Sequence, residues 1–355
     1  MEYRKFEYEN DAIKQFINLP KKLYDKNTNT EDAKQMKELL LNKHILNKYF
    51  HLDKFLIYSD NKVVGRFCIT TYPNDETAYI GYFECIDDSN VAKFLFKTAY
   101  DFAKENGYKK IVGPVDSSFW IKYRLKINMF EYRPYTDEPY NKEYYYKLFL
   151  ENNYKVIEHY TSRRFPIIDE TYFNGKFEQR YEEFRKKGYS IISPDINNYK
   201  KIVNELYYLI TDLYSDFPIF KNLSIEDFKE IFGEYKRIIR TEMVKMAYWN
   251  NKAVGFYISI PNYYNKVYHL NILNLLSILK LKKKPKEYVM LYMGVDREHT
   301  GLGKALVGAI EEELKRNKLP SIGALARDGK ITQEYGNELV KEQYEYVLME
   351  CDIYD

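Results

Sequence analysis

Cysteine is scarce in this chain, with only Cys68, Cys85 and Cys351 among 355 residues. These residues lie far apart and form neither a Cys-x-x-Cys pair nor a cluster with histidine, so the sequence predicts no disulfide framework and no metal site. An uninterrupted apolar run of about 18 residues is also missing, which argues against integral membrane association. The charged first residues, MEYRKFEYEND, lack the apolar core of a secretion signal, and we expect a cytoplasmic protein.

An excess of charge of either sign is missing too. The chain has 55 basic and 52 acidic residues, a net charge of +3, which gives no electrostatic argument for binding nucleic acid. Its hydrophobic content of 45% and charged content of 30% are those of an ordinary globular protein. The length of 355 residues suits two domains better than one.

The most informative stretch runs from Tyr288 to Asn317 and predicts a strand, a glycine turn and a helix. Val289 to Val295 is an apolar run short enough for one buried strand. After a polar turn come Gly301 and Gly303, followed by apolar residues at helical spacing. Glycines let a ligand approach the backbone, and the unpaired N–H groups of a helix's first turn attract an anion. The pattern predicts a phosphate cradle, although glycines needed only for packing would also explain it.

Two common phosphate-binding loops are excluded because their defining residues are absent. The Gly-x-x-x-x-Gly-Lys-Ser/Thr pattern of the P-loop does not occur here. The Rossmann fingerprint is excluded as well, because only Gly-x-Gly is present and no acidic residue ends a strand at the usual spacing.

The stretch resembles motif A of the GCN5-related N-acetyltransferases, in which a strand ending in valine leads into a Gly-x-Gly-x-Ala-Leu helix start. The match here is Val295 and then Gly301-Leu302-Gly303-Lys304-Ala305-Leu306. The resemblance implies that this loop holds the diphosphate of acetyl-CoA, with these residues around the cofactor: Val295, His299, Thr300, Gly301, Leu302, Gly303 and Lys304. The family usually has Arg or Gln three residues before the first glycine, whereas this chain has Glu298 in a shorter loop.

An internal repeat indicates that the chain holds two copies of one fold. Asn61-Lys62-Val63-Val64-Gly65 recurs as Asn251-Lys252-Ala253-Val254-Gly255, and Tyr79-Ile80-Gly81-Tyr82 corresponds to Tyr288-Val289-Met290-Leu291. We therefore predict an α/β protein with a mixed sheet, made of two tandem GNAT-like (acyl-CoA N-acyltransferase) domains. The predicted lobes are residues 1–165 and 189–355, joined by a connector at 166–188.

The two copies differ at the predicted cradle. Where the second has its glycines, the first has Asp87-Asp88-Ser89-Asn90. Carboxylates at a helix N-terminus bind its free N–H groups and would repel a diphosphate. We therefore expect the first lobe to be degenerate and unable to bind CoA in the usual way.

The first half also resembles a bacterial group of long acetyltransferase-family proteins. The matching residues are Gly113-Pro114, Ser117-Ser118, Tyr123-Arg124, Glu138-Pro139-Tyr140-Asn141 and Tyr144-Tyr145. The segment from Asp116 to Asn141 is long, irregular and too aromatic for disorder, so we expect it to be functional. Its candidates for substrate binding are Tyr123, Arg124, Glu138 and Asn141. Arg124 and Glu138 could bind a carboxylate and an amine, or they could form an internal ion pair that fixes the loop.

Acyl transfer needs a held thioester, a base for the amine and often an acid for the leaving thiolate. The resemblance implies a tyrosine acid on the helix after the fifth strand, and Tyr335, in a predicted helix at 331–339, occupies about that position. With 38 tyrosines in the chain, the match could also be coincidental. Glu84 is our candidate base, with Asp296 and Glu298 as alternatives.

The insertion at 267–286 is apolar first and then rich in lysine. It predicts a lid or a packing helix, with a dimer contact or a membrane-surface helix as alternatives.

The leading functional hypothesis is an acetyl-CoA-dependent N-acetyltransferase acting on a small or amino-acid-like amine bound between the lobes. One alternative is a non-catalytic acyl-CoA sensor of the same fold. The other is a tRNA-dependent aminoacyl transferase, which the nearly neutral charge disfavours. We expect a small-molecule amine as partner and no nucleic acid, and a homodimer is an open alternative to a monomer.

Overall fold

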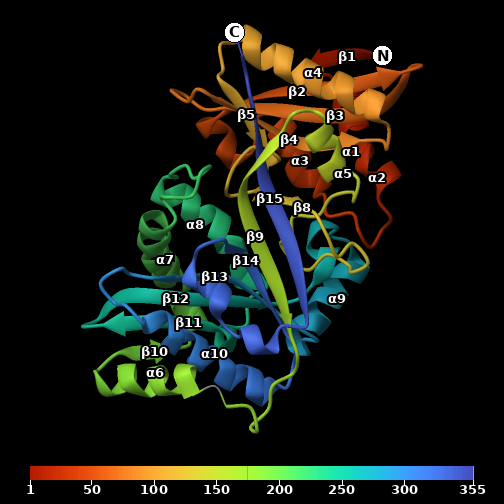
Figure 1. Cartoon of the computed structure of the whole chain (residues 1–355). Coiled ribbons are helices and arrows are strands. Elements are labelled where there is room, and N and C mark those ends of the chain that lie inside the picture. Colours follow the sequence, from red (N-terminus) through yellow and green to blue (C-terminus); the bar gives the residue numbers. More distant parts are fainter. Residues whose placement is uncertain (174, 355) are drawn as a thin grey trace. The chain divides into compact units, whose positions relative to one another are not determined.

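The computed structural model describes residues 1–173 and 175–354, which form two compact units (Figure 1). Unit 1 contains Met1–Thr161, Val267–Leu270 and the end of the chain from Tyr344. Unit 2 contains Ser162–Lys266 and Asn271–Gln343.

These units differ from the predicted lobes at four places. Val267–Leu270, predicted in the second lobe, belongs to unit 1, and residues 162–165, predicted in the first lobe, belong to unit 2. The sequence predicts that residues 344–355 belong to the second lobe, but the chain from Tyr344 onward packs in unit 1. The sequence also predicts a connector at 166–188, but most of this segment is a helix, α6 (Gly175–Lys186), that packs inside unit 2.

The sheet of unit 1 has the strand order β1-β2-β3-β4-β5-β15-β9, so the last strand of the chain lies between two strands from its first half. The strands are β1 (Glu2–Phe6), β2 (His51–Ser59), β3 (Lys62–Thr71), β4 (Thr77–Cys85), β5 (Lys110–Gly113), β9 (Lys155–Phe165) and β15 (Glu342–Asp352). Three short strands accompany them: β6 (Val115–Asp116) pairs with β7 (Lys122–Tyr123), and β8 (Leu125–Lys126) pairs with β15.

The helices of unit 1 are α1 (Asn10–Asn18), α2 (Pro20–Leu23), α3 (Ala33–Leu40), α4 (Ser89–Glu105) and α5 (Tyr145–Glu151), with a 3-10 helix η1 (Ile45–Tyr49). The core forms where the apolar side of α4 meets β3, β4 and β5, with Leu95, Phe67 and Ile80 among its fully buried residues. Burial of this apolar surface is the main term that stabilises the unit.

The sheet of unit 2 has the order β14-β13-β12-β11-β10, with the end of β9 beside β14. Its strands are β10 (Ser190–Ile192), β11 (Val244–Trp249), β12 (Lys252–Pro261), β13 (Tyr288–Val295) and β14 (Ser321–Arg327). Its helices are α6, α7 (Tyr199–Leu213), α8 (Ile225–Gly233), α9 (Ile272–Lys283) and α10 (Leu302–Asn317). Short 3-10 helices are η2 (Ile196–Asn198), η3 (Glu234–Arg237), η4 (Thr241–Met243), η5 (Tyr264–Tyr268), η6 (Ile331–Glu334) and η7 (Asn337–Leu339).

The predicted repeat is visible in the hairpins of the two units. Asp60 and Asn61 connect β2 to β3, and Asn250 and Asn251 connect β11 to β12, each with a positive φ. Two successive positive φ values define the type I′ turn, which fits the twist of a two-residue hairpin and favours Asn and Asp. The same turn chemistry therefore builds the same hairpin twice.

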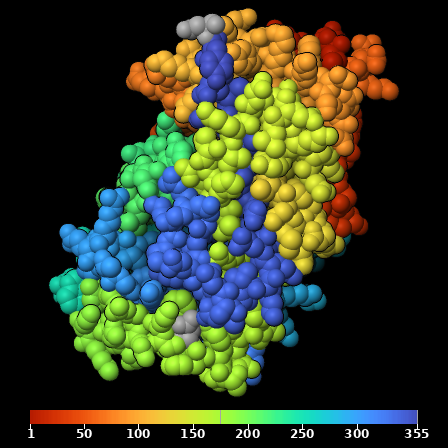
Figure 2. Space-filling view, viewed as in Figure 1, coloured from red at the N-terminus to blue at the C-terminus, as the bar shows by residue number. Residues whose placement is uncertain are grey.

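Helix α6 lies directly against α10 within unit 2 (Figure 1). In the space-filling view the yellow-green surface of α6 adjoins blue surface of the C-terminal part of the chain (Figure 2). The backbones of the two helices are so close that a Cβ on Gly308 would lie 2.7 Å from the carbonyl oxygen of Phe177. Only glycine fits this crossing, and α6 is thereby held beside the first turns of α10.

One predicted helix differs from the structure. The helix predicted at 331–339 is replaced by η6 and η7, because Gly336 between them has φ of +67° and interrupts helical geometry. Among the described helices, none combines the length and the apolar character needed to cross a bilayer.

Candidate active site

The predicted cradle lies at the N-terminus of α10, where Gly301 is the residue before the helix and has φ of +92°. A side chain would strain this left-handed conformation, which explains the glycine. Within the described chain no side chain caps this helix end. Leu302 N donates to His299 O at 3.1 Å, and Lys304 N donates to Gly301 O at 3.2 Å. The N–H groups of Thr300, Gly301 and Gly303 have no acceptor in the described chain.

The backbone of this turn is open to solvent although the helix behind it is buried. Gly301, Gly303 and Lys304 are half-buried and Thr300 is exposed. Leu302 is fully buried and packs with the apolar residues that follow it on α10. Leu302 therefore anchors the turn, while its neighbours present unpaired N–H groups, an arrangement suited to an anion.

The strand leading to this turn separates from its neighbour before it ends. β13 pairs with β14 only at Tyr288, Val289 and Met290, and the register with β12 then shifts, which leaves Leu291 as an extra residue. Such a bulge re-aims the strand and is frequent beside active sites. From Leu291 to Val295 the strand is half-buried.

Tyr335 reaches the cradle although its predicted helix is absent. A Cβ built on Gly303 would lie 3.1 Å from Tyr335 Oη and 3.0 Å from Met293 Cε. The ring of Tyr335 packs edge-on against Phe177, with 5.4 Å between centroids. Burial raises the pKa of Tyr335, so its hydroxyl keeps its proton at neutral pH. The structure thus brings together Tyr335, Gly301 and Gly303, three residues predicted from sequence.

His299 has a partner inside the protein. Its Nδ1 lies 2.6 Å from Tyr189 Oη, and Tyr189 in turn stacks on Trp249. The ligand atoms of His299, Asp296 and Glu298 lie within 4.8 Å of one another, a spacing that a metal ion could use. Asp296 already accepts from Glu298 N and lies 3.8 Å from Lys252. These contacts account for the trio as a loop-fixing cluster, and they also place negative charge beside the cradle.

A cation that the sequence does not reveal offsets this negative charge. A Cβ on Gly301 would lie 3.9 Å from Cζ and Nε of Arg180, which α6 carries. Arg180 forms an ion pair with Glu183 at 2.7 Å and remains 45% exposed. The sequence does not indicate Arg180, because its segment is predicted as part of the connector and its position depends on the crossing of α6 and α10 at Gly308.

Glu84, the predicted base, belongs to unit 1 and lies in a buried network. Its Oε2 accepts from Tyr145 Oη at 2.5 Å, and its Oε1 lies 3.9 Å from Arg66 Nη2. Arg66 is almost fully buried and pairs chiefly with Glu31. Burial raises the pKa of Glu84 to about 7, which suits a group that exchanges a proton near neutrality. Its assignment as the base stays a prediction.

Two of the substrate-binding candidates stack on each other in unit 1. The guanidinium carbon of Arg124 lies 3.7 Å from the ring centroid of Tyr123 and 4.2 Å from that of Tyr160. Arg124 has φ of +91°, a strained value for a residue with a side chain. Within the described chain Arg124 has no carboxylate partner, so its charge is available to an anionic ligand.

The other two candidates have internal partners. Glu138 is 1% exposed and accepts from Lys126 Nζ at 2.6 Å and from Tyr346 Oη at 2.7 Å. Asn141 bonds the backbone N and O of Lys126 at 2.7 and 3.1 Å. Both therefore support the loop from inside. The alternative of an Arg124–Glu138 pair is wrong, because the cation beside Glu138 is Lys126.

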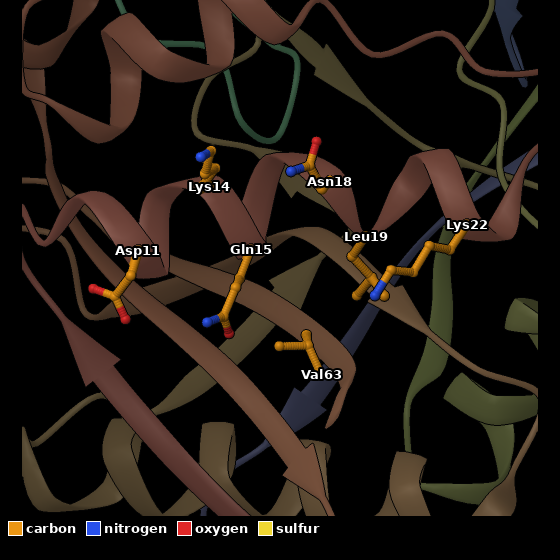
Figure 3. A pocket seen from close by; sticks show the side chains of 7 residues that line it. All are labelled: Asp11, Lys14, Gln15, Asn18, Leu19, Lys22 and Val63. Atoms are coloured by element: carbon orange, nitrogen blue, oxygen red, sulfur yellow. The ribbon is translucent and has the colours of Figure 1, made fainter. Parts of the chain in front are cut away.

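A hollow of about 290 Å³ lies elsewhere, on the outer side of α1 in unit 1 (Figure 3). It is lined by Asp11, Lys14, Gln15, Asn18, Leu19, Lys22 and Val63. None of the predicted site residues belongs to it. Its polar groups come mostly from one exposed helix face and do not converge on a buried point, as they would in a ligand site.

No protein-family model matches the sequence, and no curated protein does either. Solved structures do match in fold. A tandem GNAT protein from the clavulanic acid biosynthesis pathway aligns over 100% of this chain and 99% of its own length, with 12% identity and a TM-score of 0.54. A GCN5-related N-acetyltransferase from Anabaena variabilis aligns over 99% of this chain and 73% of its own, with 10% identity and a TM-score of 0.51.

A third match is a GCN5-related glucosamine N-acetyltransferase region of a fungal multi-domain GH3 β-N-acetylglucosaminidase. It has 14% identity and a TM-score of 0.56, and the alignment covers 99% of this chain but 38% of that protein. At such identities the likeness establishes the fold. The chain has the mixed α/β fold of the GCN5-related N-acetyltransferases in its tandem form, so the predicted fold class is confirmed.

Proposed function

We propose that the protein is an acetyl-CoA-dependent N-acetyltransferase whose acetyl donor binds unit 2. The observation that carries this proposal is the uncapped N-terminus of α10, with the hydroxyl of Tyr335 beside Gly303. Free N–H groups and a protonated hydroxyl at one point are what a diphosphate and a leaving thiolate require.

The residues of unit 2 divide the work of holding the donor. The N–H groups of Thr300, Gly301 and Gly303 donate to the diphosphate, and Arg180 and Lys304 supply positive charge. The part of β13 beyond Met290, no longer paired with β14, offers backbone groups to the amides of the pantetheine arm. Val295 and Leu302 shape the turn, and His299 fixes it through Tyr189.

Acetyl-CoA supplies an activated thioester. The amine nitrogen of the acceptor forms a bond to the acyl carbon, and the carbon–sulfur bond breaks. The proton on Tyr335 Oη passes to the departing thiolate, and the amine loses its proton to a carboxylate base.

Arg124 indicates the class of acceptor. A guanidinium held between two tyrosine rings, without a carboxylate partner in the described chain, suits an acceptor that carries a carboxylate. We therefore expect an amino-acid-like amine. Glu138 and Asn141 act indirectly, by fixing the loop that carries Arg124.

Titration calorimetry with acetyl-CoA tests the proposed site. The double variant Gly301→Asp, Gly303→Asp places one carboxylate at the helix end, where the first copy has Asp88, and a second in the first turn of α10. We expect it to lose binding by about 100-fold or more. Unchanged affinity in this variant would refute the assigned site.

A non-catalytic acyl-CoA sensor is the second candidate, favoured by Glu298 where the family usually has Arg or Gln. Thiol release measured over a panel of amines separates the two functions. An enzyme releases CoA with at least one amine, whereas a sensor binds acetyl-CoA and releases none.

A further inference from the structure

Leu270, just before α9, and the outer face of α9 itself form an exposed apolar surface. Six aliphatic side chains in one ten-residue stretch are between 52% and 78% exposed: Leu270, Ile272, Leu273, Leu275, Leu276 and Leu279. Exposed apolar residues are normal when scattered singly, but a contiguous patch marks a binding surface.

The exposed side chains belong to a regular, capped helix. The side chain of Asn271 caps α9 by accepting from Asn274 N at 2.9 Å. On the inner side Ile278 and Leu281 are 6% and 7% exposed, and near the end of the helix Arg240 of unit 2 donates to the carbonyl of Lys282 at 3.5 Å. The insertion therefore packs through one narrow face and leaves the wider apolar face uncovered, so the predicted packing role explains only part of it.

A cluster of positive charge directly follows the apolar face. Lys280, Lys282, Lys283, Lys284 and Lys286 lie within seven residues, and the segment from Val267 to Lys286 contains no acidic residue. In the described parts of the chain none of these lysines pairs with a carboxylate, and Lys282 bonds only the carbonyl of Arg237, at 2.7 Å. Elsewhere Lys97 of α4 pairs with Asp101, and Lys315 of α10 pairs with Glu178.

We propose that α9 binds the surface of an anionic phospholipid membrane. Its leucines and isoleucine would enter the boundary between headgroups and acyl chains, and the five lysines would contact the negative headgroups. A bilayer satisfies both features at once. A second copy of this chain satisfies only the first, because pairing two such helices brings together lysines with no acidic residue of this segment to neutralise them.

This inference does not depend on the proposed acetyl transfer. It assigns a location of action, at a membrane surface, to a protein whose described helices cannot cross one. The acceptor amine would then be met where lipid headgroups or membrane-bound molecules are concentrated.

Vesicle flotation tests the proposal with the full chain. Wild type is mixed with vesicles of phosphatidylcholine alone or with about 30% phosphatidylglycerol, and we expect binding only to the anionic vesicles, weakening as salt rises. The variant Leu273→Ser, Leu276→Ser, Leu279→Ser should reduce the bound fraction about tenfold, because it removes inserted apolar surface. Its melting temperature should stay unchanged, since all three side chains are exposed.

A charge variant and its matched control separate the electrostatic part. Lys283→Glu, Lys284→Glu should abolish binding to anionic vesicles, whereas Lys200→Glu, Lys201→Glu, an equal charge change at exposed positions of α7, should not. The proposal is refuted if wild type ignores anionic vesicles, if the leucine variant binds as well as wild type, or if sedimentation shows a dimer through α9 instead. Calorimetry with acetyl-CoA on the same leucine variant, expected unchanged, keeps this result distinct from that of the active site.

Discussion

The N-termini of α4 and α10 occupy equivalent places in the two copies of the fold. A carboxylate caps the first helix, whereas no side chain in the described chain caps the second. Before α4, Asp88 has an extended backbone, and its carboxylate accepts from Asn90 N at 2.8 Å and Val91 N at 3.3 Å. Before α10, Gly301 has a left-handed backbone and no side chain to cap the helix. One helix thus satisfies its own N–H groups, and the other leaves them for an external anion.

The strands that lead into these helices also differ, because only in unit 1 is the strand before the helix covered by other parts of the chain. β4 and β5, like β13 and β14, share only three pairs. In unit 1 the chain itself fills the space beyond them: Asp116 Oδ1 accepts from Tyr82 N at 2.6 Å, and a Cβ on Gly81 would lie 1.8 Å from Val115 O. β4 is accordingly buried almost throughout, whereas β13 is half-buried from Leu291 on.

The comparison teaches that a few side chains can change the end of a helix while the surrounding fold stays the same. The framework is shared down to the type of hairpin turn. In unit 1, Asp88 binds N–H groups at the end of α4, and Asp116 binds the backbone of β4. The proposed donor site in unit 2 rests on the lack of such side chains at the described end of α10.

The largest effect is expected from Tyr335→Phe, which removes the proposed acid without changing the shape of the site. We expect kcat for CoA release to fall by about 100-fold or more, the usual contribution of a positioned general acid. The affinity for acetyl-CoA should not change, because the cradle is intact. An unchanged kcat would mean that Tyr335 is not the general acid, and one of the two features that support a donor site in unit 2 would be lost.

Glu311→Gln probes a buried difference between α10 and α4. Glu311 is 7% exposed, its Oε2 has no partner in the described chain, and burial raises its pKa to about 8. The equivalent position of α4 is Thr98, whose hydroxyl donates to Phe94 O. Because the folded pKa exceeds that of the unfolded chain, Glu311 costs stability as pH rises from about 4.5 toward 8.

Glutamine carries no such penalty. At pH 8 we expect the Glu311→Gln variant to be more stable than wild type by about 2 kcal/mol, with little difference near pH 4.5. Urea unfolding at the two pH values measures this. Equal stability of the two proteins at both values would mean that Glu311 is ionised in the folded state.

Arg180→Ala tests the cation beside Gly301 against a matched neighbour. Arg180 and Arg185 both lie on α6, and each pairs with a glutamate three residues away at 2.7 Å. Only Arg180 lies at the cradle, so its loss should weaken acetyl-CoA binding about tenfold, or 1.4 kcal/mol. Arg185→Ala should bind as wild type does. Equal effects of the two variants in calorimetry would assign the loss to general charge.

The smallest expected effect is that of Asp88→Ala. Removing this cap should destabilise unit 1 by about 1 kcal/mol and leave acetyl-CoA binding unchanged. Asp87→Ala is the control, since among the described contacts Asp87 bonds no N–H group of α4. Denaturant unfolding compares the two, and the capping assignment fails if Asp87 proves the more important.

The local parts of this picture could be predicted from sequence because they depend on neighbouring residues. The glycines before α10, the aspartates before α4 and the repeated hairpins are set by turn and cap chemistry within a few positions. Their predicted contrast does not require knowledge of the rest of the fold.

The parts that could not be predicted depend on contacts between distant segments. β8 pairs with β15, which places Tyr346 opposite Lys126. Both side chains then donate to Glu138. Arg180 reaches Gly301 because α6 crosses α10 at Gly308. Local sequence patterns determine neither the register of such strand pairs nor the path of a crossing helix. The ion partner of Glu138 and the cation at the cradle could therefore not be predicted.

The position of β15 has a consequence for how the protein is made. This strand is translated after both of its neighbours, yet it lies between β5 and β9 inside the sheet of unit 1. Until β15 emerges, β5 lacks its partner at Met349–Asp352 while some two hundred residues are synthesised after β5 itself. The sheet of unit 1 is thus completed only after the strands of unit 2 have been translated, and a gene cut after residue 165 would encode β5 and β9 without the strand that lies between them.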